Sequence, residues 1–235
     1  MLKIKTPFYG TKIFTGFLLE KVLEYLHKKT LFYVRWQFNK KDEHTEPEKI
    51  YNKIVRTAVV KRLVELKAIW GIFKVKKNGQ DLILYENDNI TFTFKRQKKE
   101  PFLSLVDFFN DDDIIVFQIV TIGDGILKYS KELYDKGNFS DYFFYYNFGS
   151  ELTEAFAEFF HNFICGELNI KDKKICKRFS PGYPAWPSLE DQAKIFNLLK
   201  PERININLSP NYQMIPEHST DALLVFNENA KYFTI

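Results

Sequence analysis

The spacing of apolar residues predicts two long helices. Between residues 139 and 168 an apolar side chain recurs every three or four positions, which places these side chains on one helix face. The stripe consists of Phe144, Phe148, Leu152, Phe156, Phe159 and Phe163. A second stripe follows Pro47, a residue favoured in the first helical turn, and predicts a helix from Glu48 to about Ala68. Both stripes are expected to face a hydrophobic core.

Other apolar runs predict strands. Asn78-Gly79 separates two β-rich runs and predicts a hairpin, because both central residues of a type I′ turn need positive φ. The run 90–94 is expected to add a third strand, and the apolar run 113–123 predicts a strand buried on both faces. Two further strands are predicted at 204–208 and 222–226.

Shorter segments complete the pattern. Residues 18–26 have helical spacing, 31–38 are consistent with a strand or a buried turn, and 103–109 with a short helix or a loop. Ser188, with Asp191 three residues later, predicts an N-cap and capping box for a helix at 189–199.

The order of these elements indicates the fold class. Helices and strands are mixed without a regular βαβ rhythm, which favours an α+β fold with a twisted antiparallel sheet and helices packed on it. No repeat, low-complexity tract or long Gly/Ser linker interrupts the 235 residues, of which 45% are hydrophobic. The sequence therefore predicts a single domain over residues 1–235.

Composition and charge exclude several classes of protein. The net charge of +4 is too small to argue for nucleic acid, and the basic run 95–99 is expected to be a solvated loop. No stretch reaches the roughly 18 uninterrupted apolar residues of a membrane span, and the N-terminus lacks a signal-peptide core. We therefore expect a cytoplasmic protein with no membrane partner and no nucleic-acid partner.

Known catalytic and metal motifs are missing from the sequence. It contains no GxGxxG, GxxxxGK[ST], GxSxG or HExxH pattern, and its four histidines lie far apart. Cys165 and Cys176 form no CxxC pair, so we expect reduced thiols rather than a disulfide or metal ligands. His161 lies beside the long apolar stripe and is expected to be a packing or capping residue, not a general base.

One stretch remains unexplained by these patterns. RFSPGYPAWP, residues 178–187, places three prolines and a glycine between an arginine and a predicted helix. Proline fixes φ and removes a donor, whereas Gly182 lets the backbone approach a ligand closely. The loop is therefore expected to be preorganised, either to hold a ligand or as a purely structural connector.

This stretch resembles the reactivation domain of cobalamin-dependent methionine synthase. The resemblance rests on RxxxGYPAxP followed by a helix and on further segments in the family's order, which together cover nearly the whole chain. These segments are PFYGTK (7–12), YLHKKTLFYVRWQF (25–38), WGIFKVKKNGQDLILY (70–85), FKRQ (94–97), LVDFF (105–109), IIVFQIVTIG (114–123), LTEAFAE (152–158) and AKYF (230–233). The family often carries this module as the C-terminal part of a very large enzyme, whereas here we expect a free-standing chain.

The resemblance implies a repair function. The family restores inactive cob(II)alamin by one-electron reduction, coupled to methyl transfer from S-adenosylmethionine (AdoMet). It implies AdoMet as the bound ligand, cobalamin held by the cobalamin-binding domain of a separate methionine synthase chain, and a flavodoxin-type electron donor. The chain would then be a methyltransferase component that is inactive alone.

The resemblance also implies site residues. Arg178 matches the family's ligand-binding arginine, which would hold the methionine carboxylate, and Glu154 matches an acidic residue suited to the ammonium. Gly182 belongs to the binding loop, with Tyr183 facing the corrin. Tyr232 and Phe233 match the paired aromatic residues that reach the adenosine.

Two departures from the family bear on this interpretation. Trp186 stands where the family commonly has cysteine, an exchange that a core can absorb. Lys28 falls about where some members carry an aspartate that contacts the ligand, and a cation cannot replace that acceptor. Lys28 therefore favours the alternative, a non-catalytic corrinoid-protein-binding module that has lost AdoMet binding.

Overall fold

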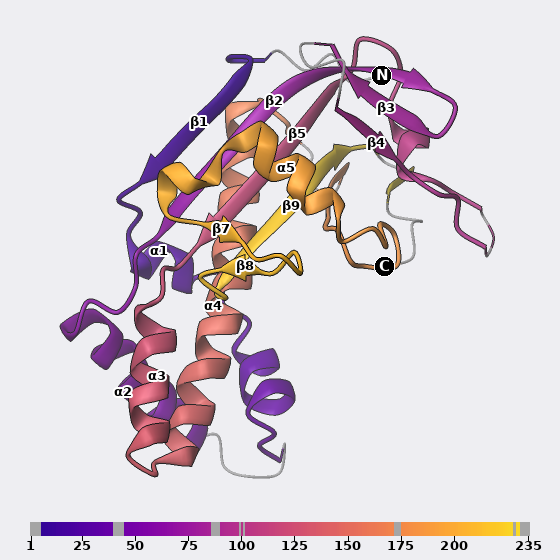
Figure 1. Cartoon of the computed structure of the whole chain (residues 1–235). Helices are drawn as coiled ribbons and strands as arrows, with labels where there is room; N and C mark the ends of the chain where they lie inside the picture. The colour runs from indigo at the N-terminus through magenta and orange to yellow at the C-terminus, as the bar shows by residue number, and fades with distance from the viewer. Residues whose placement is uncertain are drawn as a thin grey trace.

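The computed structural model describes residues 6–39, 45–85, 90–98, 100, 102–171, 175–227 and 229–230. One large antiparallel sheet forms the middle layer of the molecule (Figure 1). Its strands are β1 (Gly10–Thr15), β2 (Lys67–Asn78), β3 (Asp81–Leu84), β4 (Thr91–Thr93), β5 (Ile114–Thr121), β6 (Cys176–Phe179) and β9 (Ser219–Phe226). The order across the sheet is β4-β3-β2-β5-β9-β6, and β1 pairs with the first half of β2.

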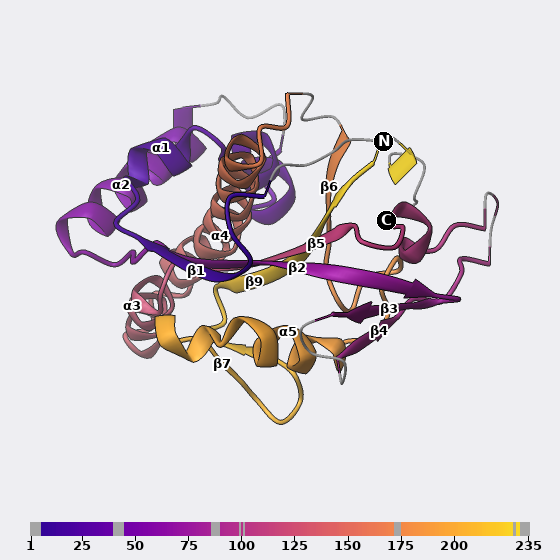
Figure 2. The same ribbon diagram turned by 90° about the horizontal axis from the view of Figure 1, so that it is seen from above.

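Helices cover both faces of this sheet. Seen along the sheet in Figure 2, α4 lies on one side with α1 and α2, and α5 lies on the other side with β7. The helices are α1 (Leu19–Leu23), α2 (Thr45–Val60), α3 (Gly125–Asp135), α4 (Phe139–Glu167) and α5 (Asp191–Leu199). A small hairpin of β7 (Asn207–Leu208) and β8 (Met214–Ile215) follows α5. The α+β fold with an antiparallel sheet and packed helices is confirmed.

The core consists of two apolar clusters, one on each face of the sheet. Side chains alternate along a strand, so β9 contributes Ala222 and Leu224 to the α4 side but Leu223 and Val225 to the α5 side. Strand β5 is buried along almost its whole length, which confirms the prediction of a strand covered on both faces. The predicted stripe of α4 packs into the cluster on its own side of the sheet.

A hairpin forms where predicted, but its turn is shifted by one residue. Asn78 pairs with Asp81, so Gly79 and Gln80 are the central residues, and of these only Gly79 has a positive φ, +60°. A glycine at the first central position is typical of a type II′ turn rather than the predicted type I′ turn. The third strand follows as β4. The segment 103–109 contains a short 3-10 turn, Leu105–Phe108.

The predicted end of the helix that follows Pro47, at about Ala68, was wrong. α2 ends at Val60, and Arg62 adopts a left-handed φ of +52° that turns the chain. The residues from Lys67 onward belong to β2, between β1 and β5, where their apolar side chains are buried on both faces. Tertiary burial in the sheet therefore overrides the apparent helical spacing.

Three local predictions also need correction. Segment 31–38 contains a π-helical turn, Thr30–Arg35, in which Phe32 and Trp36 stack with ring centroids 5.4 Å apart. α5 begins at Asp191, and Ser188 provides no side-chain cap, because Asp191 accepts a hydrogen bond from the Trp186 indole instead. In segment 204–208 only Asn207–Leu208 is a strand, since a 3-10 turn, Pro201–Ile204, precedes it.

Among the helices and strands in the described part of the chain, α3, β1, β6 and β8 were not predicted as such. In addition, none of the helices in the described part of the chain combines the length and the apolar character of a membrane span.

α4 passes so close to His218 that Gly149 leaves no room for a side chain. A Cβ at Gly149 would lie 2.3 Å from His218 Cε1. We expect Gly149→Ala to lower the free energy of unfolding by about 1–3 kcal/mol, the usual cost of overpacking, in urea denaturation. Gly166→Ala in the same helix is the control, because a Cβ there meets nothing within 4 Å. The control should gain up to about 1 kcal/mol from helix propensity, and equal effects of the two changes would contradict the close contact.

Candidate ligand-binding site

The first part of the site lies between β6 and α4. Arg178 pairs in register with Leu224, so its side chain lies on the face of the sheet that α4 covers. Glu154 and Glu158 are four residues apart on α4 and therefore share a helix face. The Arg178 Nη2 atom lies 3.3 Å from Glu158 Oε2 and 3.9 Å from Glu154 Oε2. The structure thus brings the predicted Arg178 and Glu154 together.

Glu158 is a member of this cluster that the sequence analysis missed. The nearby His161 ring and the Arg178 guanidinium lower the pKa of Glu158 to about 2. Glu158 is therefore ionised at neutral pH and occupies part of the Arg178 fork. The signal for it was present, because Glu158 follows Glu154 by one helical turn.

The loop after β6 is closed by its own backbone. Gly182 has φ +87°, its N–H donates to the Trp186 carbonyl at 2.8 Å, and the Trp186 N–H donates to the Tyr183 carbonyl at 2.8 Å. The Trp186 indole is buried and donates to Asp191 Oδ2 at 2.7 Å, which anchors the loop to α5. Burial of Trp186 also shows that the core absorbs the exchange from cysteine. Tyr183, by contrast, remains 54% exposed.

A small hollow of about 170 Å³ joins these parts. It is lined by Glu154, Arg178, Phe179, Ser180, Tyr183, Ala185 and Thr220. Three of the predicted site residues, Glu154, Arg178 and Tyr183, therefore surround one space. Gly182 lines the adjoining groove with Tyr183. Tyr232 and Phe233 lie outside the described residues, and their role stays a prediction.

Lys28 does not line this hollow. Its ammonium pairs with Glu48 at 3.0 Å and lies 4.5 Å from the centroid of the Tyr51 ring. The cation is thus held by α2 rather than by the residues around Arg178.

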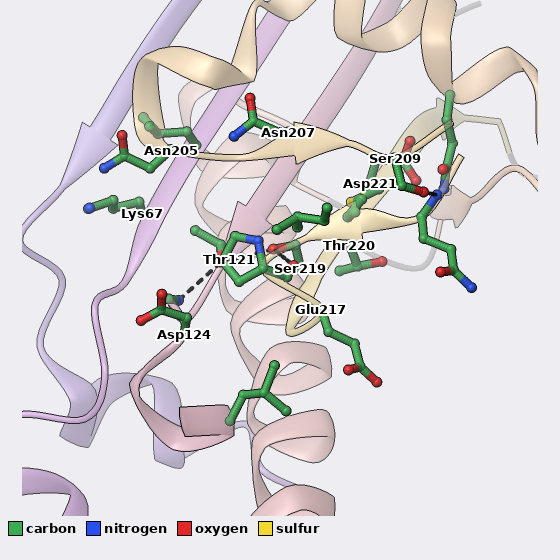
Figure 3. A pocket seen from close by; sticks show the side chains of 18 of the residues that line it. Lys67, Thr121, Asp124, Asn205, Asn207, Ser209, Glu217, Ser219, Thr220 and Asp221 are labelled. Atoms are coloured by element: carbon green, nitrogen blue, oxygen red, sulfur yellow. Dashed lines mark hydrogen bonds between the residues drawn. The ribbon is translucent and has the colours of Figure 1, made fainter. Parts of the chain in front are cut away.

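A larger open groove of about 1250 Å³ lies next to the hollow (Figure 3). Ser180, Tyr183 and Thr220 line both spaces, so the groove continues from the hollow. The wall includes Asp221 of β9, which is only 2% exposed and whose Oδ2 atom has no hydrogen-bond partner. Burial raises the pKa of Asp221 to about 7, against partial compensation by hydrogen bonds from its own backbone and from Gln192 of α5. Neither the groove nor Asp221 was predicted.

Comparison with known proteins decides the family. The family "Vitamin B12 dependent methionine synthase, activation domain" matches residues 18–235. The chain belongs to this family. The resemblance inferred from the sequence motifs is thereby confirmed, and the chain is homologous to part of a methyltransferase enzyme.

Relatives agree with this assignment. The activation domain described here is 29% identical over 275 residues to the methionine synthase of Mycobacterium tuberculosis, and 28% identical over 275 residues to that of Mycobacterium leprae. Each alignment covers 97% of this chain but only 23% of the relative, so the chain spans about a quarter of their length.

A solved structure shows the same fold. The crystal structure of the MetH reactivation domain bound to AdoHcy superposes with a TM-score of 0.86 at 19% sequence identity. The match covers 97% of this activation domain and 82% of that chain.

Proposed function

We propose that this activation domain binds AdoMet and presents its methyl group to cobalamin held by the cobalamin-binding domain of a separate methionine synthase chain. The observation that carries the proposal is the meeting of Arg178, Glu154 and Tyr183 around one hollow beside the closed 180–186 loop. The solved relative bound to AdoHcy, the product of methyl donation by AdoMet, supports the choice of ligand.

The charges of the hollow suit the methionine end of AdoMet. Arg178 offers a planar fork of donors to the carboxylate, and Glu154 offers an acceptor to the ammonium. Because Glu158 already lies 3.3 Å from Arg178, the ligand carboxylate must share the fork with Glu158 or displace it. The hollow of about 170 Å³ is smaller than a pocket for a whole drug-sized ligand, which takes roughly 300–1000 Å³. We therefore assign the hollow to the methionine end and, by the family resemblance, the adenosine to Tyr232 and Phe233.

The chemistry requires positioning more than acid–base catalysis. Cobalamin held by the partner would supply the nucleophile once a flavodoxin-type donor had reduced it by one electron, and irreversible methylation would draw that unfavourable reduction forward. No proton has to be moved by the protein in methyl transfer from a sulfonium. Arg178 and Glu154 orient the donor, while the closed loop holds the exposed Tyr183 ring beside it. These roles agree with the lack of a general-base motif.

Calorimetry with AdoMet tests the binding step. We expect saturable binding of one AdoMet per chain, competed by AdoHcy. A folded chain that gives no saturable heat would contradict the proposal. If that chain still bound a cobalamin-binding domain, the result would favour the non-catalytic corrinoid-protein-binding module.

Tyr183 should act only when the cobalamin partner is present. Its ring is exposed and lies where the hollow opens to the groove, so it can pack against the corrin and exclude water. We expect Tyr183→Ala to bind AdoMet within a few-fold of wild type. Single-turnover methylation of the partner's cobalamin, followed by corrin absorbance, should slow by at least about tenfold, equivalent to roughly 1.4 kcal/mol in the barrier.

The matched control for this variant is Tyr212→Ala, because Tyr212 also lines the groove but lies outside the hollow. An unchanged methylation rate for Tyr183→Ala would reduce the ring to a packing role. Loss of AdoMet binding in the isolated variant would instead place the ring inside the ligand site.

A further inference from the structure

Three metal-binding side chains converge in the core beneath the edge strand β6. His161 and Cys165 are one turn apart on α4, and Cys176 is the first residue of β6. One ligand atom from each residue lies within 4.8 Å of the other two. All three residues are buried, with exposed fractions of 6%, 1% and 4% respectively.

The environment of His161 is unusual for a buried histidine. Neither of its ring nitrogens has a partner within hydrogen-bond distance, since Glu158 Oε2 lies 3.9 Å from Nδ1, whereas buried polar atoms generally have such a partner. Cys165 and Cys176 belong to the apolar cluster on the α4 side, together with Ile164, Leu168, Ile170 and Ile175. A bound ion would give one imidazole nitrogen a partner at bonding distance.

We propose that His161, Cys165 and Cys176 form a Zn²⁺ site. Zinc prefers thiolate and imidazole ligands at about 2.0–2.3 Å, which places neighbouring ligand atoms roughly 3.5–4 Å apart. Ligand atoms within 4.8 Å therefore need only a small inward shift of the side chains. Two thiolates and a neutral imidazole around Zn²⁺ carry no net charge, which suits an apolar core. The same ligands around a monovalent copper ion would leave one buried negative charge, which is costly.

Glu158 lies beside the three ligands without converging on them. Its Oε2 atom lies 3.9 Å from His161 Nδ1, one turn earlier on α4, and 3.3 Å from Arg178 Nη2. Zinc sites in proteins are usually four-coordinate and tetrahedral, and a site with three protein ligands takes a water molecule at the fourth position. The three converging side chains therefore define the protein ligand set.

The site escapes motif searches for a topological reason. Its ligands are separated by four and then eleven positions, and they come from a helix and from a strand at the edge of the sheet. Only the pairing of β6 with β9 brings Cys176 against α4.

Cobalt substitution of the reduced wild-type chain tests the proposal without any mutation. We expect one Co²⁺ per chain, with a thiolate-to-cobalt charge-transfer band in the near ultraviolet and the intense visible bands of tetrahedral coordination. Zn²⁺ should displace the cobalt and should raise the melting temperature of the chain. Because the sequence contains only two cysteines, the charge-transfer band reports on Cys165 and Cys176 alone.

Variants check the ligand set. Cys165→Ala and His161→Gln should weaken Zn²⁺ binding by roughly 100-fold or more in a chelator competition. His27→Gln, which changes an exposed histidine, should leave the affinity unchanged. A folded, reduced wild-type chain that shows no charge-transfer band would overturn the proposal. A Cys165–Cys176 disulfide that, once reduced, still takes up no metal would overturn it as well.

Discussion

Arg178→Ala should weaken AdoMet binding by roughly 10- to 150-fold, equivalent to about 1.5–3 kcal/mol, when measured by isothermal titration calorimetry. The side chain is the cation that the structure places in the hollow with Glu154, and a charge-assisted hydrogen bond to the ligand carboxylate has this value. Removal of Arg178 also leaves Glu154 and Glu158 without their partner cation. The two glutamates then repel the carboxylate of the ligand. Arg178→Lys should lie between wild type and Arg178→Ala, because it retains the charge but loses the planar fork.

Lys177→Ala provides the matched control for the arginine. Lys177 is the neighbouring residue on β6, and its side chain lies on the opposite face of the sheet. The Lys177→Ala variant loses the same charge from the same strand, but only a screened long-range interaction connects that charge with the ligand, so its AdoMet affinity should stay within about twofold of wild type. Equal affinities for wild type and Arg178→Ala would remove Arg178 from the site.

Asp221→Asn should stabilise the domain in a pH-dependent way. Burial raises the pKa of Asp221 from 3.8 to about 7 in the folded chain, so folding takes up a proton between these pH values. The contribution of Asp221 to stability should therefore be lost as pH rises from about 4 to 7, and the loss should then level off. Asn cannot ionise, so the variant should match wild type near pH 4. At pH 8 it should exceed wild type by about 3–5 kcal/mol, since each pKa unit corresponds to about 1.4 kcal/mol.

Urea denaturation of both proteins across this pH range provides the measurement. Asp124→Asn is the control, because Asp124 lines the same groove but is exposed and paired with Lys128. Its free energy of unfolding should differ from wild type by less than about 1 kcal/mol at every pH. Parallel pH curves for wild type and Asp221→Asn would show that the Asp221 carboxyl is not desolvated in the folded protein.

Elements with a strong local signal were predicted from the sequence. The phenylalanine stripe of α4 recurs at helical spacing over a long segment, and Gly79 supplies the positive φ of the tight turn between β2 and β3. The unpredicted α3 also carries such a signal, since Ile126, Tyr129 and Leu133 have helical spacing and all pack toward the core.

Elements that depend on tertiary contacts were not predicted. β6 has only four residues and no clear alternation of exposed and buried side chains, so its pairing with β9 defines it. The boundary between α2 and β2 depends on the left-handed Arg62 and on burial of the following residues in the sheet. The spacing of apolar residues along the chain reveals neither the pairing of β6 nor the boundary between α2 and β2.

The candidate site likewise contains residues that sequence motifs predicted and residues that only the fold brings together. Arg178 and Glu154 were predicted from motifs, and the contact between β6 and α4 in the fold places the two side chains close together. Glu158 could have been found from its position one turn after Glu154. The groove, the desolvated Asp221 and the cluster of His161, Cys165 and Cys176 arise from residues far apart in the sequence, so no local pattern indicates them.

Reconstitution with a methionine synthase that lacks its activation domain tests the central claim most directly. The truncated enzyme, inactivated in its cob(II)alamin form, would be mixed with this chain, AdoMet and a reduced flavodoxin-type donor, and methionine formation would be followed. We expect turnover to return only when the chain and AdoMet are both present, and Arg178→Ala to restore it poorly. The chain alone should form no methionine from homocysteine and a methyl-folate. If a folded chain that binds AdoMet restored no turnover and methylated no cobalamin on the partner, the proposed reactivation function would be contradicted.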